Sequence, residues 1–119
     1  MSQAASILLL ALLAWFPNIA HAAVYDGTWS VLVITDRGTC DRAYRYTVGI
    51  NGGKVRFRGA DQVNLSGRVD RAGRVQVAIS RGSQSAIGTG RLSADTGTGT
   101  WRGRSGGQQC SGRLEAERR

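Results

Sequence analysis

Histidine, proline and methionine are missing from residue 23 onward, because the single copy of each lies within the first 22 residues. Without an imidazole, segment 23–119 cannot build a Ser-His-Asp or Cys-His nucleophile, or a histidine-ligated zinc or haem site. If its two cysteines are bridged, no thiolate remains as a nucleophile or soft metal ligand. We therefore expect no enzyme, no catalytic residues, no metal and no cofactor.

Acidic residues are few, and they give little support to an enzyme. A glycosidase needs only a pair of carboxylates, but no spacing in this sequence singles out such a pair. Asp36, Asp61, Asp70 and Asp95 lie in glycine-containing stretches, where aspartate serves turn geometry. An enzyme that uses carboxylates and tyrosine is the least favoured of the function classes considered.

Residues 1–22 have the pattern of a secretory signal peptide. The uncharged apolar run ILLLALLAWF is followed by Pro17 and by the small-residue site Ala20-His21-Ala22. The run is shorter than the roughly 20 apolar residues that span a bilayer; an uncleaved amphipathic anchor is the alternative. We expect an exported protein, periplasmic or extracellular, whose single domain is 23–119 and which has no transmembrane segment after cleavage.

The two cysteines, Cys40 and Cys110, are expected to form a disulfide, since an even pair in an exported protein is typical of a bridge. Such a bridge would close a loop of about 70 residues, which the chain-entropy model values at about 4 kcal/mol.

Apolar residues alternate with polar ones over 44–50, 54–58, 63–69 and 74–80. This period of two predicts half-buried antiparallel strands. Seven intervening stretches contain the glycine, asparagine or aspartate of hairpin turns, so eight short strands are expected. We predict an all-β fold, an up-and-down meander closed as a small barrel with one disulfide, because closure removes exposed edges. A two-sheet β-sandwich is the alternative.

The inward side of the predicted barrel has several large aromatic residues and many glycines. Alternation places Trp29, Trp101, Tyr44 and Tyr46 on the core side. The glycines of 88–112 favour volume compensation for the two indoles, since small barrels fill their interiors with side chains. The alternative hypothesis is a pocket in which the four aromatic residues form an interior ligand wall.

Gly27-Thr28-Trp29, at the start of the first predicted strand, resembles the G-x-W opening of lipocalin-like and avidin-like barrels. That resemblance implies an eight-stranded barrel that binds a small apolar or amphipathic ligand, with Trp29 as a barrel-closing core residue. The whole of 23–119, which ends in TWRGRSGGQQCSGRLEAERR, also resembles small signal-bearing proteobacterial proteins. That resemblance implies no particular activity. In size and single disulfide the chain is also similar to secreted metalloprotease inhibitors of barrel fold, which use an N-terminal arm; here only 23–26 precede the first strand.

The chain has a formal net charge of +8, and all but one of its basic residues are arginines. A solvated exterior accounts for such charge, but a surface for an anionic envelope polymer or lipid is also possible. Nucleic acid is the least favoured partner, because single-strand binders need exposed aromatic residues among the basic ones. The candidate polyanion residues are Arg45, Arg56, Arg58, Arg68, Arg102, Arg104 and Arg113.

These observations favour a non-catalytic exported barrel, either a binding module or a structural component of the envelope. The alternative is a protein-interaction module, such as a secreted protease inhibitor or an adhesin, that acts through its arginine-rich face.

Overall fold

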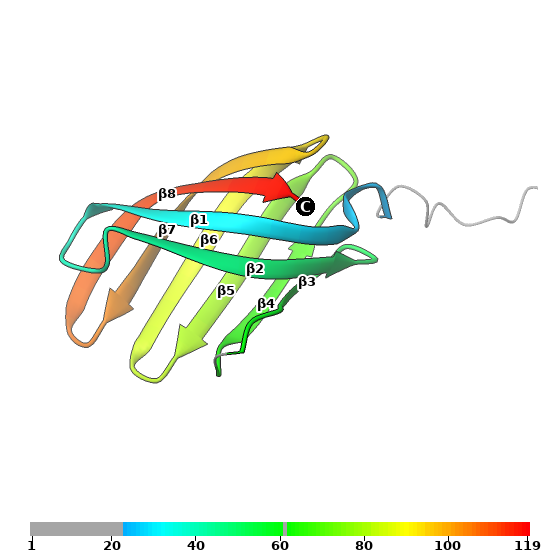
Figure 1. Ribbon diagram of the computed structural model, residues 1–119. Helices are drawn as coiled ribbons and strands as arrows, with labels where there is room; N and C mark the ends of the chain where they lie inside the picture. Colours follow the sequence, from blue (N-terminus) through cyan, green and yellow to red (C-terminus); the bar gives the residue numbers. More distant parts are fainter. Residues whose placement is uncertain (1–22, 61) are drawn as a thin grey trace, which may run out of the picture.

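The computed structural model describes residues 23–60 and 62–119, so the expected signal peptide lies outside the described residues. One short 3-10 helix precedes eight strands (Figure 1). Their bounds are η1 Ala23–Tyr25, β1 Gly27–Arg37, β2 Ala43–Asn51, β3 Lys54–Phe57, β4 Asn64–Val69, β5 Arg74–Arg81, β6 Gln84–Ser93, β7 Thr96–Ser105 and β8 Gln108–Arg118.

The eight strands form one closed antiparallel barrel. Each strand pairs with its neighbour in the chain, and β8 returns to pair with β1. At this seam Val31 lies opposite Tyr46 of β2 on one side and Ala116 of β8 on the other. The predicted meander barrel is therefore confirmed, and closure leaves no separate second sheet, so the sandwich alternative is wrong.

The disulfide joins the loop between β1 and β2 to the start of β8. Cys40 and Cys110 have an S–S distance of 2.05 Å and a Cα–Cα distance of 6.2 Å. The predicted bridge is confirmed, and Cys40 lies in the loop before Ala43. Next to the bridge, the pairing of β1 with β8 shifts register between Thr35 and Arg37, as a β-bulge does.

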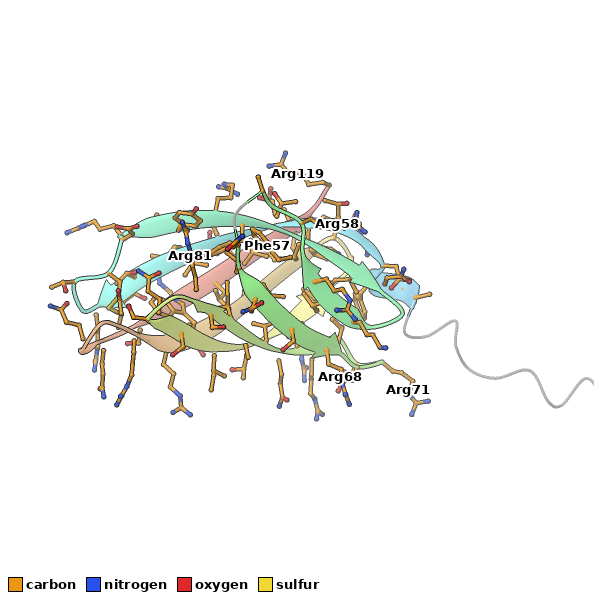
Figure 2. All side chains as sticks on the ribbon, turned by 90° about the horizontal axis from the view of Figure 1, so that it is seen from below. Phe57, Arg58, Arg68, Arg71, Arg81 and Arg119 are labelled. Carbon is orange, nitrogen blue, oxygen red and sulfur yellow. A yellow bond between two sulfur atoms is a disulfide. The ribbon has the colours of Figure 1, made fainter. Side chains whose placement is uncertain are left out.

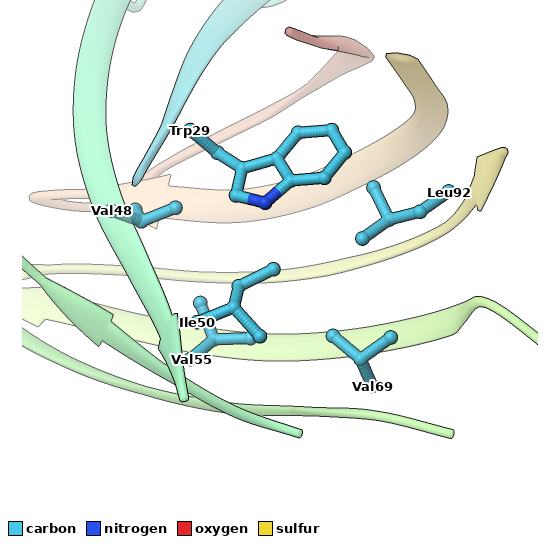
Figure 3. Close-up of a cluster of buried hydrophobic side chains, with 6 residues drawn as sticks. All are labelled: Trp29, Val48, Ile50, Val55, Val69 and Leu92. Atoms are coloured by element: carbon cyan, nitrogen blue, oxygen red, sulfur yellow. The ribbon is translucent and has the colours of Figure 1, made fainter. Parts of the chain in front are cut away.

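One end of the barrel is tightly packed. It comprises η1 and the turns β2–β3, β4–β5 and β6–β7, and we call it the packed end. The core cluster lies here, around a Trp29 side chain that is 1% exposed (Figure 3). The Trp29 indole donates a hydrogen bond from Nε1 to the Tyr25 carbonyl oxygen at 2.9 Å, which ties η1 to the core. The other members of the cluster are Val48, Ile50, Val55, Val69 and Leu92.

Arg118 closes the packed end from the last strand. It lies opposite Trp29 in the β1–β8 pairing, and its guanidinium carbon is 4.8 Å from the centre of the indole. Arg118 donates to the Asp95 carboxylate at 2.9 Å and to the Asp26 carbonyl oxygen at 2.6 Å. A charge at this position is stabilised because both the ring face and the hydrogen bonds favour a cation.

Glycines on the inner side of β6, β7 and β8 permit close approach between strands. Gly90 and Gly99 lie directly opposite each other, and a Cβ on either would collide with a carbonyl oxygen of the neighbouring strand. A Cβ at Gly88 would come within 3.0 Å of the Leu114 and Val77 side chains. At these three positions the nearest atoms belong to neighbouring strands and aliphatic side chains. Close approach of neighbouring backbones therefore explains Gly90 and Gly99, whereas Gly88 lies directly opposite Trp101, where the sequence predicts room for an indole.

Candidate functional site

The end of the barrel opposite the packed end is hollow. This open end comprises the β1–β2 loop and the connections β3–β4, β5–β6 and β7–β8. A cavity of about 770 Å³ extends into it from the Trp29 core. We call this cavity the chamber. Its volume falls within the range of about 300–1,000 Å³ that is typical of small-molecule sites.

Side-chain exposure within the barrel supports the same picture. Val31, Val75 and Val77 point inward by alternation, line the chamber and contact the core, yet they are only half-buried. Val69, which points inward at the packed end and does not border the chamber, is 4% exposed. Inward-facing valines of a filled barrel would all be buried, so the difference reflects space that side chains do not occupy.

All four residues of the predicted aromatic wall border the chamber. Trp29 forms its floor, where the indole is already packed in the core. Tyr44 and Tyr46 lie on β2 with ring centres 4.7 Å apart, and Tyr44, nearer the mouth, is 37% exposed. The structure therefore brings these side chains to one cavity but at different depths.

Trp101 lines the chamber and is also held in place by a hydrogen bond. It lies opposite Gly112 of β8, and Gly112 is itself opposite Thr35 of β1. The indole passes this glycine and donates a hydrogen bond from Nε1 to the Ile34 carbonyl oxygen of β1 at 2.9 Å. Trp101 thus links β7 to β1 beside the bulge, and with the nearby disulfide it holds the seam at the open end.

Arg81 is a chamber residue that the sequence did not suggest. The sequence predicts a strand over 74–80, but β5 continues through Arg81, so this residue follows Val75, Val77 and Ile79 on the inward side. It lines the chamber, and Figure 2 shows it within the outline of the barrel, toward the end away from Arg71. Extending the predicted alternation by two residues from Ile79 would have placed Arg81 on the inward side of the strand.

The mouth of the chamber is polar, in contrast to its depth. Hydroxyl and amide side chains gather around it, together with the charged residues Asp41, Arg81 and Arg104. The polar lining residues at this end include Thr39, Ser80, Ser83, Gln84 and Ser105.

A smaller hollow of about 510 Å³ lies in the side wall beside β3 and β4. It shares Leu65, Ile79 and Ser80 with the chamber lining. β3 pairs with β2 only from Val48 to Asn51, so β2 extends beyond its partner strand at this side. Fewer residue pairs therefore join β2 to β3 than join β1 to β2.

The candidate polyanion arginines do not form one group. Arg45 donates to the Ser30 hydroxyl at 2.9 Å, and Arg58 donates to the Thr28 hydroxyl at 3.3 Å, so both cover β1 and β2. Arg113 forms a two-bond ion pair with Asp36, at 2.9 and 3.0 Å. These hydrogen bonds lower the pKa of the Asp36 carboxyl below its ordinary value.

The remaining four share the outer side of β3–β7 with further cations. We call this surface the basic face. Its exposed cations are Lys54, Arg56, Arg68, Arg74, Arg91, Arg102 and Arg104, and the outward positions of these five strands, as described, contain no carboxylate. Figure 2 shows nitrogen-tipped side chains projecting from this side. Its register places Arg74 directly opposite Arg91 and Lys54 directly opposite Arg68.

Other kinds of site find no support in the part of the chain that the structure describes. No group of three or more histidine, cysteine or acidic side chains there is arranged to hold a metal ion. Nor does any described helix have the length and apolar character needed to cross a membrane.

Comparison with protein-family models, curated proteins and solved structures finds no significant match to this chain. The function must therefore be argued from the chamber and the surface of the barrel.

Proposed function

We propose that the protein is an exported, non-catalytic binding module that holds a small apolar or amphipathic ligand inside the barrel. The observation on which this rests is the set of half-buried valines facing a cavity of about 770 Å³. Apolar surface left in water costs about 25 cal/mol per Å². A ligand that fills the chamber would remove this surface from water.

The scaffold also supports a binding role, because the chamber is held open before any ligand arrives. The packed end fixes one end of every strand, and the Cys40–Cys110 bridge and the Trp101–Ile34 hydrogen bond fix the seam at the other. A preformed cavity spares the ligand the free-energy cost of ordering its site.

The test is binding of an apolar fluorophore whose emission rises out of water, with protein recovered from an envelope fraction. Ala86→Trp adds an indole from the inward side of β6, where Ala86 lines the chamber. Ala78→Trp makes the same change at an exposed, outward position of neighbouring β5. We expect the inward variant to lose fluorophore affinity by 10-fold or more, about 1.4 kcal/mol, and the outward variant to bind normally.

Two results would contradict the proposal. One is a wild-type protein that fails to bind the fluorophore. The other is equal binding by the Ala86→Trp and Ala78→Trp variants when urea unfolding shows both to be folded.

The basic face supports a second candidate, an interaction module that acts on an anionic envelope polymer or lipid. Directly opposed like charges such as Arg74 and Arg91 destabilise a sheet, and an anionic partner would relieve that repulsion. Retention on anionic vesicles should fall as salt rises. Arg91→Gln should weaken retention more than Arg113→Gln, since Arg113 is paired with Asp36 away from this face. Equal retention of the two variants would reject this candidate.

A further inference from the structure

We propose that the chamber takes a single-chain amphiphile with an anionic oxygen head, and that Arg81 binds this head at the mouth. This inference rests on the binding function proposed above and specifies its ligand class. The shared chemistry is a carboxylate or a phosphate attached to an apolar chain.

The first observation is the direction of Arg81. Along β5 the side chains of Val75, Val77 and Ile79 point into the barrel, and Arg81 continues this side at the open end of the strand. Its neighbour across the β5–β6 pairing is Gln84, a polar residue of the chamber lining. Lys54 and the other arginines of the basic face point outward, so Arg81 is distinguished from them by placement.

The second observation is the change in polarity along the chamber. Deep positions are aliphatic, such as Val31, Val77 and Leu114, and they surround the hydrophobic floor. The mouth is lined by hydroxyls, amides and charged groups, as described above. A ligand with an apolar chain and a polar head matches this gradient in one orientation only, chain inward and head outward.

The third observation is the sign of charge at the mouth. Among the described lining residues, Asp41 is the only acid, whereas Arg81, Arg91 and Arg104 are cations. Arg91 and Arg104 border the chamber from outward positions of their strands, so Arg81 is the inward-facing cation of the three. The guanidinium presents five N–H donors in a planar fork that suits carboxylate and phosphate oxygens. Tyr44 of β2 also lines the chamber, and its side chain carries a hydroxyl.

A structural role for Arg81 is the competing explanation, in which its aliphatic stem and its contacts only stiffen the mouth. The two roles differ in one measurable way. If Arg81 binds the head, its removal changes the preference between charged and neutral ligands of equal chain length. If Arg81 only stiffens the mouth, its removal changes the affinity for both kinds of ligand equally.

The experiment measures displacement of the apolar fluorophore by four ligands with the same chain: decanoate, decyl phosphate, decanol and decyltrimethylammonium. We expect the wild-type protein to bind at least one of the two anions roughly 10-fold or more tightly than decanol, since hydrogen bonds to charged groups are strong. Decyltrimethylammonium should bind most weakly. Whether decanoate or decyl phosphate is preferred then distinguishes a fatty acid from a phosphorylated lipid as the source of the head.

Arg81→Gln should abolish the preference for anions and leave decanol affinity within about two-fold. Arg81→Lys should retain part of it, because the charge remains but the fork is lost. Arg74→Gln is the matched control: it removes the same charge from the same strand, but Arg74 is exposed on the outer side. This control should keep the full preference.

The outcomes separate the inference from the function on which it rests. Equal binding of decanol and both anions by the wild type would overturn the anionic head and leave the binding function intact. If Arg74→Gln and Arg81→Gln reduce the preference for anions over decanol equally, that preference arises from the net charge of the protein. This result also overturns the inference. Failure of the fluorophore and all four ligands to bind would reject the binding function itself.

Discussion

The two ends of the barrel are built from the same strands, but one end is filled by side chains and the other encloses a chamber. At the packed end, inward side chains fill the interior around Trp29, and Arg118 and η1 cover it. At the open end, inward side chains of similar size leave a chamber, and the walls are held by a disulfide and a tethered indole. One end therefore gains stability from burial, and the other keeps its shape through covalent and polar ties.

This division explains how a small barrel can be hollow and still fold. Tight packing at one end fixes the register of all eight strands, since a slip of one residue would turn the core residues outward. The open end then needs only enough ties to prevent collapse. Truncation of a core side chain at the packed end should therefore lower stability, whereas truncation of a side chain that lines the chamber should chiefly change ligand binding.

The largest effect is expected from Trp29→Ala. It removes the most buried large side chain, its hydrogen bond to Tyr25 and the ring beneath Arg118. The expected loss is about 5 kcal/mol of unfolding free energy, at the upper end for aromatic truncation in a core. Urea unfolding checks it. A loss below about 1 kcal/mol would mean that the packed end does not hold the barrel together.

Replacing both Cys40 and Cys110 by serine should cost about 4 kcal/mol, because the disulfide restricts a loop of 70 residues in the unfolded chain. Because the bridge lies at the open end, fluorophore affinity should fall as well, even in conditions where the variant stays folded. Intact mass before and after reduction verifies the bridge in the wild type. A variant that loses stability but keeps full affinity would show that the bridge does not shape the chamber.

Alternation in the sequence was sufficient to predict the barrel, but it could not predict that the open end is hollow. Apolar residues every second position predict which side faces inward, so β5 was expected at 74–80 and is found at Arg74–Arg81. Val31 and Val69 obey the same alternation, yet Val31 borders the chamber and is half-buried, whereas Val69 is buried away from it. That difference depends on the volume enclosed by the closed sheet, which no local pattern records.

Two inward-facing arginines were missed for a related reason. Arg81 and Arg118 lie at strand ends, where a charged residue is ordinarily assigned to a turn or to a solvated terminus. Only the closed barrel reveals that Arg118 covers the Trp29 ring and that Arg81 stands at the mouth. The Cys40–Cys110 bridge could be predicted because two cysteines allow one intramolecular pairing.

A pair of identical substitutions compares the ends directly. Val69→Ala at the packed end should cost about 2 kcal/mol, since Val69 does not border the chamber and the change removes two buried methyl groups and leaves a cavity. Val33→Ala enlarges a chamber that is already open, because Val33 is a half-buried lining residue, and should cost less than about 1 kcal/mol. Equal losses measured by urea unfolding would indicate that the chamber is filled in solution.

The smallest effect concerns the ion pair between Asp36 and Arg113, which joins β1 to β8 on the outside of the open end. Hydrogen bonds from Arg113 lower the folded-state pKa of Asp36, so the pair stabilises the fold above the unfolded-state pKa, near 3.8. This contribution is lost as pH falls through the folded-state value. The stability difference between wild type and Asp36→Asn should therefore be small at neutral pH and should shrink on acidification.

Carboxyl titration by NMR measures the Asp36 pKa directly, and Arg113→Gln should return it toward its ordinary value. A stability difference that stays constant into acid would assign the effect of Asp36→Asn to the side chain's shape and not to its charge.

Because both groups are exposed, salt should weaken the pair. The disulfide and the Trp101 hydrogen bond do not depend on exposed charge. High salt should therefore remove most of the Asp36 contribution and leave fluorophore affinity unchanged. A parallel loss of affinity would mean that the outer pair also helps to hold the chamber open.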